Sequence, residues 1–340
     1  MFSTKLGQYV LFFGTASLIS YIAMKFNSNS NHTIDEYELI KKYLLNESPL
    51  YGYNRPKLWI HSKYELNARK WKDFQSRTST DLNQPYLHLT IKSIINHCGN
   101  DFNICLIDDE SFSKLIPNWD IDLVTIAEPM KSYYRELGLL QLLYFYGGMV
   151  VPNSFVCLKN LMSLYTDSDK PFFCENINRS LNLMKQKNRS LFLPSTFFMG
   201  AKKNNHIIKS LIEDLKNANR FTQEIEFQNN TSTTVLDLAK SDQVRVILGQ
   251  MIGTKTNHRK QILIDDLMGE NYLDLSDDIY GVYIPADEVL LRTKYLWFAY
   301  LSQEEILDSN MIITKYLKAS IVNGSDIYSQ KTEVKSVISI

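Results

Sequence analysis

The sequence lacks an excess of charge of either sign, because its 37 Lys and Arg residues are balanced by 37 Asp and Glu residues. No global basic field can therefore attract nucleic acid, and we expect no nucleic-acid partner. Cysteine is also scarce, and none of the four cysteines has the C-x-x-C spacing of a structural zinc site. We expect buried thiols, with one disulfide open if the body of the protein is lumenal; the cysteines are Cys98, Cys105, Cys157 and Cys174.

Several short catalytic motifs are missing as well. The chain has no G-x-S-x-G, no H-E-x-x-H, no Walker loop and no G-x-G-x-x-G, which argues against hydrolase, zinc protease and nucleotidase functions. What the chain does contain is 44% hydrophobic and 12% aromatic residues. This composition is ample for a globular protein with a buried core.

One apolar segment precedes the globular part. Residues 6–24 carry no charged side chain and are just long enough to cross a bilayer. We interpret residues 6–25 as an uncleaved transmembrane signal anchor, following a short tail at 1–5; a cleaved signal peptide and a buried helix are the alternatives. This predicts a single-pass membrane protein, with a lumenal body in the ER or Golgi slightly favoured by the flanking charges.

Beyond a linker and short helix at 26–54, apolar runs alternate between strand-like and helix-like spacing. The expected strands are Lys57–His61, Phe102–Ile107 and 149–151, and the expected helices are Pro85–His97, Ser111–Ile116, Met130–Tyr146 and His206–Leu215. Such alternation is typical of an α/β fold with a mostly parallel sheet. We assign it to one globular domain at 55–315, followed by a tail at 316–340.

In parallel α/β sheets, ligands bind beyond the carboxyl ends of the strands. His61, Asp108 and Asp109 are therefore expected near a cleft. Strand-end solvation or helix capping is the alternative for all three, and it is the favoured interpretation for Asp109 and Glu110.

The segment Met130–Tyr146 is apolar on most sides and should be a largely buried helix. Arg135 within it needs a carboxylate partner, because a buried unpaired charge is very costly. The candidate partners are Asp108, Glu128 and Glu136.

This helix and the turn after it carry a family resemblance. Ser132-Tyr-Tyr-Arg135, Leu139-Leu140, Leu143-Tyr144 and Tyr146-Gly147-Gly148 resemble the S-D-x-x-R…L…Y-x-Y-G-G-x-y-x-D-x-D signature of the DXD sugar transferases of glycosyltransferase family thirty-two, the group that includes capsular-polysaccharide-synthesis proteins. The run at 57–61 is similar to the family's first strand, and 193–201 is similar to its acceptor-side segment. The resemblance implies a GT-A fold and transfer of a sugar, with retention, from a nucleotide sugar to a glycan acceptor.

The chain departs from this signature at the metal site. The two family aspartates fall on Pro152 and Ser154, with Asn153 between them, and Ser132 replaces a third aspartate. Proline offers no side-chain ligand and a serine hydroxyl is a weak one, so we expect no Mn²⁺ or Mg²⁺ cofactor there. A cation held through Asp108 or Asp109, metal-free stabilisation by Lys and Arg, and lost catalysis are the alternatives.

The expected function is thus a glycosyltransferase-like protein, active or retained as a binding or scaffold protein. The donor-binding residues implied by the resemblance and the strand ends are His61, Asp108, Ser132, Arg135, Gly147, Gly148 and Asn153. Two acidic pairs, Asp265-Asp266 and Asp277-Asp278, fall in expected turns and are interpreted as solvated. The aromatic run at 295–300 is expected to complete a core.

Overall fold

The computed structural model describes residues 55–63, 84–177, 192–217 and 224–321. The chain divides into two compact units, 1–47 and 48–340, and every described residue belongs to the second. The expected anchor at 6–25, the short helix near residues 36–45 and the end of the chain after residue 321 lie outside the described residues. Among the helices that the structure describes, none is long and apolar enough to span a membrane.

A six-stranded sheet forms the centre of the second unit, in the order β2-β1-β3-β6-β5-β7. Its strands are β1 (Lys57–His61), β2 (Asn103–Ile107), β3 (Gly148–Val150), β5 (Phe172–Ile177), β6 (Phe192–Ala201) and β7 (Arg245–Ile247). Three of the five pairings are parallel, and β6 is antiparallel to both of its neighbours. The protein is therefore a mixed α/β protein, and the largely parallel sheet expected from the sequence is interrupted by one antiparallel strand.

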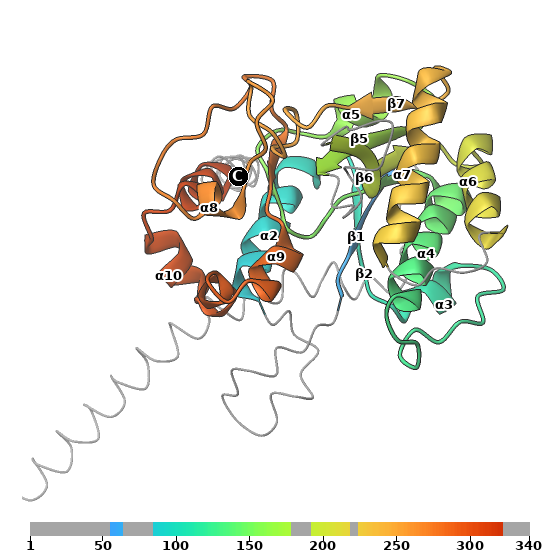
Figure 1. Cartoon of the computed structure of the whole chain (residues 1–340), viewed down its shortest axis with the longest axis horizontal. Coiled ribbons are helices and arrows are strands. Elements are labelled where there is room, and N and C mark those ends of the chain that lie inside the picture. The colour runs from blue at the N-terminus through green and yellow to red at the C-terminus, as the bar shows by residue number, and fades with distance from the viewer. Residues whose placement is uncertain (1–54, 64–83, 178–191, 218–223, 322–340) are drawn as a thin grey trace, which may run out of the picture. The chain divides into compact units, whose positions relative to one another are not determined.

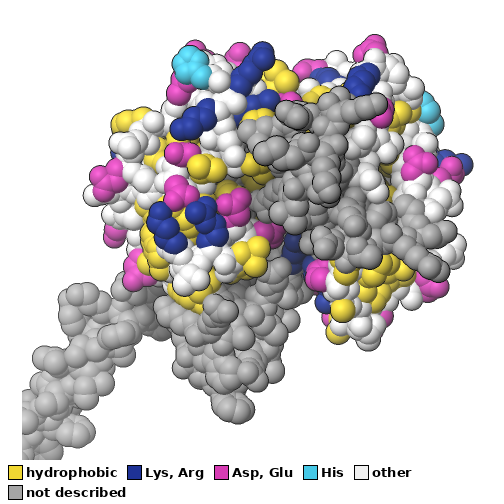
Figure 2. Space-filling model, viewed as in Figure 1, with side chains coloured by type: hydrophobic (Ala, Val, Ile, Leu, Met, Phe, Trp, Pro, Cys, Tyr) yellow, Lys and Arg dark blue, Asp and Glu magenta, His cyan; other side chains and the backbone are white. Residues whose placement is uncertain are grey.

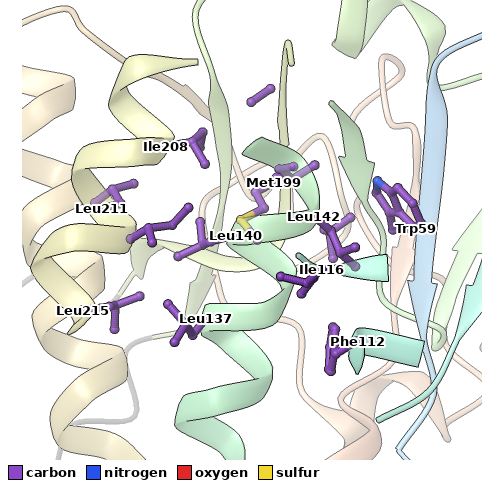
Figure 3. Close-up of a cluster of buried hydrophobic side chains, with 14 of the residues drawn as sticks. Trp59, Phe112, Ile116, Leu137, Leu140, Leu142, Met199, Ile208, Leu211 and Leu215 are labelled. Atoms are coloured by element: carbon purple, nitrogen blue, oxygen red, sulfur yellow. The ribbon is translucent and has the colours of Figure 1, made fainter. Parts of the chain in front are cut away.

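One face of this sheet is covered by helices (Figure 1). These are α3 (Ser111–Leu115), α4 (Met130–Tyr146), α6 (His206–Asn217) and α7 (Glu224–Lys240). Trp59 of β1 pairs with Val150 of β3, and Val150 pairs with Met199 of β6, so these side chains share one face of the sheet and one apolar cluster. In Figure 3, Leu137 and Leu140 of α4 face Leu211 and Leu215 of α6. The first core thus lies between the sheet and these helices.

A second core lies around α2 (Pro85–Cys98) and a two-stranded antiparallel sheet of β4 (Phe155–Cys157) and β8 (Gly281–Tyr283). It is completed by helical segments from the last part of the described chain, namely α8 (Ile264–Leu267), α9 (Ala286–Leu291), η1 (Leu296–Tyr300), α10 (Gln303–Asp308) and a helix at 312–321. A short helix, α5 (Met162–Thr166), follows β4. Figure 1 shows α8, α9 and α10 beside α2, on the other side of the strands from α4 and α6.

Most expected elements have nearly the expected bounds. The strand at 57–61 and the helix at 130–146 agree to the residue, and β2, α2, α3 and α6 differ by one or two residues at an end. The aromatic run joins the core as expected, since Tyr295, Phe298 and Ala299 are buried. Two expectations need correction. Asp265 and Asp266 belong to the start of helix α8 and not to a loop between elements. The packed part of the chain continues to residue 321, past the expected end at 315, because Leu317 and Ser320 are buried.

The surface agrees with the balanced composition. On the face shown in Figure 2, Lys and Arg side chains lie among Asp and Glu side chains, and neither sign dominates. The described residues of that face therefore form no extended basic surface for a polyanion.

Candidate functional site

The carboxyl ends of β1, β2, β3, β5 and β7 lie at one edge of the sheet, because β5 and β7 run in the same direction as β1. His61 is the last residue of β1 and pairs with Ile107, so Asp108 and Asp109 follow at the same edge. Counting two residues on from the Trp59–Val150 pair brings Pro152 level with His61. This edge collects most of the residues that the sequence singled out.

Three largely buried side chains form a charged network there. The Arg135 guanidinium donates from Nε to Asp109 Oδ1 at 2.9 Å and from Nη2 to Asp109 Oδ2 at 2.7 Å. His61 Nε2 lies 2.9 Å from the same Oδ1. The side chains are 8% (His61), 9% (Arg135) and 15% (Asp109) exposed. A bidentate pair of this kind is the strong form of a charge-assisted interaction, and it joins β1, β2 and α4.

The start of α4 adds a fourth member at the surface. Glu128 lies 3.4 Å from Nη1 of Arg135 through Oε1, and its Oε2 accepts the backbone N–H of Ser132 at 3.0 Å. The Glu128 side chain is half exposed, whereas Ser132 is buried. The expected burial and pairing of Arg135 are confirmed, with Glu128 as one partner. Its main partner is Asp109 and not Asp108.

The network determines which members carry charge. Burial alone would raise the pKa of Asp109, but hydrogen bonds from His61 and Arg135 outweigh burial and hold that pKa well below its usual range. Burial lowers the pKa of His61 from 6.5 despite the hydrogen bond with Asp109, and Arg135 and Lys63 lower it further. At neutral pH we therefore assign an ionised Asp109 and a neutral His61 whose Nε2–H donates to it. The imidazole also stacks on Phe112, with ring centroids 5.4 Å apart.

Asp108 bonds locally to the start of α3, which is the role that the sequence analysis favoured for Asp109. Its Oδ1 accepts the Ser111 N–H at 2.8 Å and the Ser111 hydroxyl at 2.6 Å. These bonds close the turn between β2 and α3. Asp108 therefore stabilises the turn that aims Asp109 at Arg135, and the helix-capping interpretation favoured for Asp109 is wrong.

The residues at the family's metal positions form the turn between β3 and β4. Ser154 is 1% exposed, and its hydroxyl donates to the carbonyl oxygen of Ile284 at 2.7 Å, while its own carbonyl accepts the Ile284 N–H at 3.1 Å. The carbonyl of Asn153 accepts the Thr90 hydroxyl. Ser154 thus ties this turn to the chain that follows β8, and its side chain points inward.

Gly147 and Gly148 lie at the opposite edge of the sheet, where β3 begins. Both have positive φ, +70° and +102°. A Cβ on Gly148 would lie 2.1 Å from the carbonyl oxygen of Lys57, at the start of β1, and the Gly147 carbonyl accepts the indole N–H of Trp59 at 3.0 Å. Gly147 follows Arg135 by twelve positions along α4, or about 18 Å of helix, so the two glycines are not part of the group around Arg135. The structure thus separates them from Arg135, and their role in donor binding stays a prediction.

A second, largely buried ion pair occupies the same carboxyl edge, and the sequence analysis did not predict it. Lys255 Nζ lies 2.6 Å from Glu175 Oε2, with 9% and 15% of the side chains exposed. The same oxygen accepts the Gly249 N–H at 2.9 Å, and Lys255 Nζ lies 4.6 Å from the Phe192 ring centroid. The pair fixes the loop after β7 to β5. Its only sequence signal is the Gly-rich run from Gly249 to Lys255 directly after a short apolar strand.

A third cluster of charges lies at the surface, between α8 and α9. Asp265 accepts from Arg292 at 3.0 Å, from Lys294 at 2.8 Å and from the Tyr295 hydroxyl. Hydrogen bonds from Lys294 and Tyr295 lower the pKa of Asp265. The carboxylate is 36% exposed and its cations more so. Across the part of the chain that the structure describes, no three His, Cys, Asp or Glu side chains converge as metal ligands would.

No known protein family matches the sequence, and no curated protein matches it either. The solved structures with partial likeness include glycosyltransferases. The apo form of the glycosyltransferase GlyE from Streptococcus pneumoniae TIGR4 is 11% identical with a TM-score of 0.37, over 83% of this chain and 64% of that one. The PaToxG glycosyltransferase is 11% identical with a TM-score of 0.32, over 85% and 96% of the two chains. The galactosyltransferase LgtC, in complex with donor and acceptor sugar analogs, is 11% identical with a TM-score of 0.31, over 78% and 95%.

The present chain spans 64% of the length of the GlyE chain.

Proposed function

We propose that the protein is glycosyltransferase-like and binds a nucleotide sugar at the carboxyl edge of β1, β2 and β3. The observation that carries this proposal is the buried His61–Asp109–Arg135 network at that edge. Open α/β sheets bind ligands outside the carboxyl ends of their strands. Ionisable groups with shifted pKa values that converge at such a place are candidates for a functional site.

The turn at 152–154 does not suit a divalent cation. The Ser154 hydroxyl already donates a hydrogen bond to the Ile284 carbonyl, and Ser154 is fully buried. A carboxylate at position 154 would place a second acceptor beside the Ile284 carbonyl oxygen, and the present hydrogen bond would be lost. Magnesium and manganese favour carboxylate oxygens, and this turn supplies none. We therefore propose that the nucleotide sugar binds without a metal ion at this turn.

Two buried cations lie at the same edge and can supply positive charge to the nucleotide sugar in place of a metal ion. Arg135 and Lys255 are buried residues at the carboxyl ends of the sheet, each with a carboxylate beside it. From β1 to β5 is three strand steps, or about 14 Å, a span similar to that of a nucleotide sugar. In the proposed complex Arg135 faces the diphosphate, Lys255 lies toward the sugar end of the donor, His61 and Asp109 flank the nucleotide, and Ser132 and Asn153 contribute polar groups.

In the active form of this proposal, the bond between the sugar and the diphosphate breaks and a new glycosidic bond forms to a glycan hydroxyl. The hydroxyl proton leaves with the nucleoside diphosphate or with solvent. The glycan acceptor is the second partner, and the resemblance implies retention of configuration.

A catalytically inactive binding protein is the second candidate, and one observation favours it. Nε and Nη2 of Arg135 both donate to Asp109, and Nη1 faces Glu128. A guanidinium that is paired with two carboxylates stabilises the folded chain whether or not a ligand is bound. A donor would then bind through the remaining polar groups, without turnover.

Titration of the full chain with UDP and GDP sugars, with and without Mn²⁺, separates these functions. We expect binding that does not depend on Mn²⁺ and that weakens at least tenfold in Arg135→Lys, with Arg292→Lys as the surface control. Release of nucleoside diphosphate in the presence of glycan acceptors identifies a transferase, and binding without release identifies the inactive form. Absence of binding by every nucleotide sugar, in a folded protein, overturns both.

We also propose that residues 6–25 anchor the protein in a membrane. The support is their uncharged apolar sequence alone. Deleting residues 1–25 should move the protein from the membrane fraction to the supernatant of a lysate. Continued sedimentation of the shortened chain with membranes, resistant to high salt, would contradict the anchor.

A further inference from the structure

Two of the four cysteines face each other in the second core. Cys98 is the last residue of α2 and Cys157 the last residue of β4. Their sulfur atoms are 4.0 Å apart, and both residues are 0% exposed. Cys105 and Cys174 are buried in strands of the large sheet, in β2 and β5. All four cysteines lie within the described residues, so the Cys98–Cys157 contact singles out one pair.

The backbone around this pair is held in place on both sides. The N–H of Cys157 donates to the Ser93 hydroxyl of α2 at 2.9 Å, so β4 is bonded directly to the helix that carries Cys98. The carbonyl of Cys157 accepts the Ser320 hydroxyl from the last described helix. The Cys157 thiol donates to the Lys159 carbonyl at 3.1 Å. The backbone of Cys157 is therefore bonded both to the helix that carries Cys98 and to the last described helix.

We propose that Cys98 and Cys157 form a disulfide under oxidising conditions, linking α2 to β4. A disulfide requires the sulfurs to approach to about 2.05 Å. The remaining approach of roughly 2 Å is of the size that side-chain rotation with a small backbone shift supplies. The inference does not depend on the proposed sugar-binding function.

The oxidant is a small-molecule disulfide such as glutathione disulfide. One protein thiolate attacks it, forms a mixed disulfide and releases one glutathione thiolate. The second protein thiolate then attacks the protein sulfur of the mixed disulfide and releases the second glutathione. The two protein thiols lose two electrons and two protons, and the oxidant becomes two glutathione thiols.

Burial makes this exchange slow in the folded protein. It raises the pKa of the Cys157 thiol well above its ordinary value, so little thiolate is present at neutral pH. The helix at 312–321 is hydrogen-bonded over the pair through Ser320, which is 1% exposed. We therefore expect the bond to form during folding, or when the end of this helix opens locally.

Peptide mapping tests the pair directly. The full chain is refolded in a glutathione buffer at an oxidising ratio, quenched in acid, alkylated and digested without reductant. We expect one linked peptide containing Cys98 and Cys157, with Cys105 and Cys174 alkylated. The oxidised protein should melt about 5 to 10 °C above the reduced protein, because the bond closes a long loop in the unfolded chain.

Matched variants make the result specific. Cys98→Ala and Cys157→Ala should each abolish the linked peptide and the redox-dependent shift in melting, whereas Cys105→Ala and Cys174→Ala should retain both. Four alkylated cysteines after oxidative refolding, or a link that involves Cys105 or Cys174, would overturn the inference. Ser320→Ala should speed oxidation of the folded protein severalfold, and an unchanged rate would show that this helix is not the barrier.

Discussion

Asp109 and Asp265 have similar partners in very different surroundings. Each carboxylate accepts from an arginine and from a second side chain with a ring, His61 in one case and Tyr295 in the other. The Asp109–Arg135 pair is 15% and 9% exposed, whereas the Asp265–Arg292 pair is 36% and 42% exposed. Similar hydrogen bonds therefore act among largely buried groups in one cluster and among partly exposed groups in the other.

The difference decides what each cluster can do. Water solvates either partner of an exposed pair when the other is removed, so such pairs contribute little to stability. A buried pair has given up that solvation, and removing one partner leaves a charge that nothing compensates. The cluster around Asp109 should thus control folding, pH response and ligand binding, and the cluster around Asp265 should affect none of them strongly.

The largest effect is expected from Arg135→Ala. The ionised Asp109 would remain buried without its guanidinium, and the free energy of unfolding should fall by about 3 to 5 kcal/mol. Arg292→Ala, the matched surface variant, should cost less than about 1 kcal/mol after screening by solvent. Urea denaturation at neutral pH measures both. Equal losses in the two variants would show that burial does not separate the clusters.

A new buried carboxylate at Ser154 should give the next largest effect. Ser154→Asp replaces a hydroxyl donor with an acceptor facing the Ile284 carbonyl, and we expect a loss of about 2 to 3 kcal/mol. Pro152→Asp, at a partly exposed position of the same turn, should cost less. Millimolar Mn²⁺ should restore neither variant. Recovery of the Ser154→Asp melting temperature by Mn²⁺ would instead identify the turn as a latent metal site.

The pH response of His61 should be smaller and has a definite sign. Its folded pKa is lowered from 6.5, so the unfolded chain binds the proton first as pH falls. The stability contributed by the neutral imidazole is complete above about pH 6.5 and decreases below it, by at most about 1.4 kcal/mol per pH unit, until the folded protein titrates. Asp109 remains ionised in this window because its pKa is also lowered.

Urea midpoints at pH 7 and pH 5 measure this response. His61→Gln keeps an N–H donor near Asp109 and should flatten the difference between the two pH values. His97 is the control, because burial lowers its pKa as well; His97→Gln should remove only its own share. A wild-type protein equally stable at both pH values would mean that His61 titrates alike in the folded and unfolded chains.

The smallest effect is expected from Lys294→Ala in the exposed cluster. Lys294 is largely exposed, so its loss should leave the urea midpoint within error of the wild type. Any small difference should disappear at about 1 M salt, where the Debye length is about 3 Å. The Arg135→Ala deficit should persist at the same salt concentration. A Lys294→Ala deficit that resists salt would place this cluster in the same class as the buried one.

Local patterns predicted the elements and the burial of Arg135 well. The strand and helix bounds follow from apolar periodicity, and the cost of an unpaired charge in an apolar helix required a carboxylate partner. The choice between Asp108 and Asp109 did not follow. They are adjacent, and the Ser111 hydroxyl bonded to Asp108 decides which one turns toward α4.

Contacts between distant segments were also outside the reach of the sequence. Glu175 and Lys255 meet only because β5 and β7 are neighbours in the sheet, and the glycines before Lys255 do not indicate which carboxylate it meets. The glycines were recognised as a turn, but their edge of the sheet depends on the length and direction of α4. A motif close to Arg135 in sequence thus lies about 18 Å away along the helix.

Gly148 has a consequence for finding relatives of this protein. A side chain there would overlap the Lys57 carbonyl, so substitution should be rejected whether or not a relative keeps any activity. The pair Gly147–Gly148 should therefore persist in descendants that have lost the ligand, whereas His61 and Asn153 are free to diverge with function. Sequence searches that require the two glycines should find relatives of this protein. Differences at His61 and Asn153 should then separate relatives that bind different ligands.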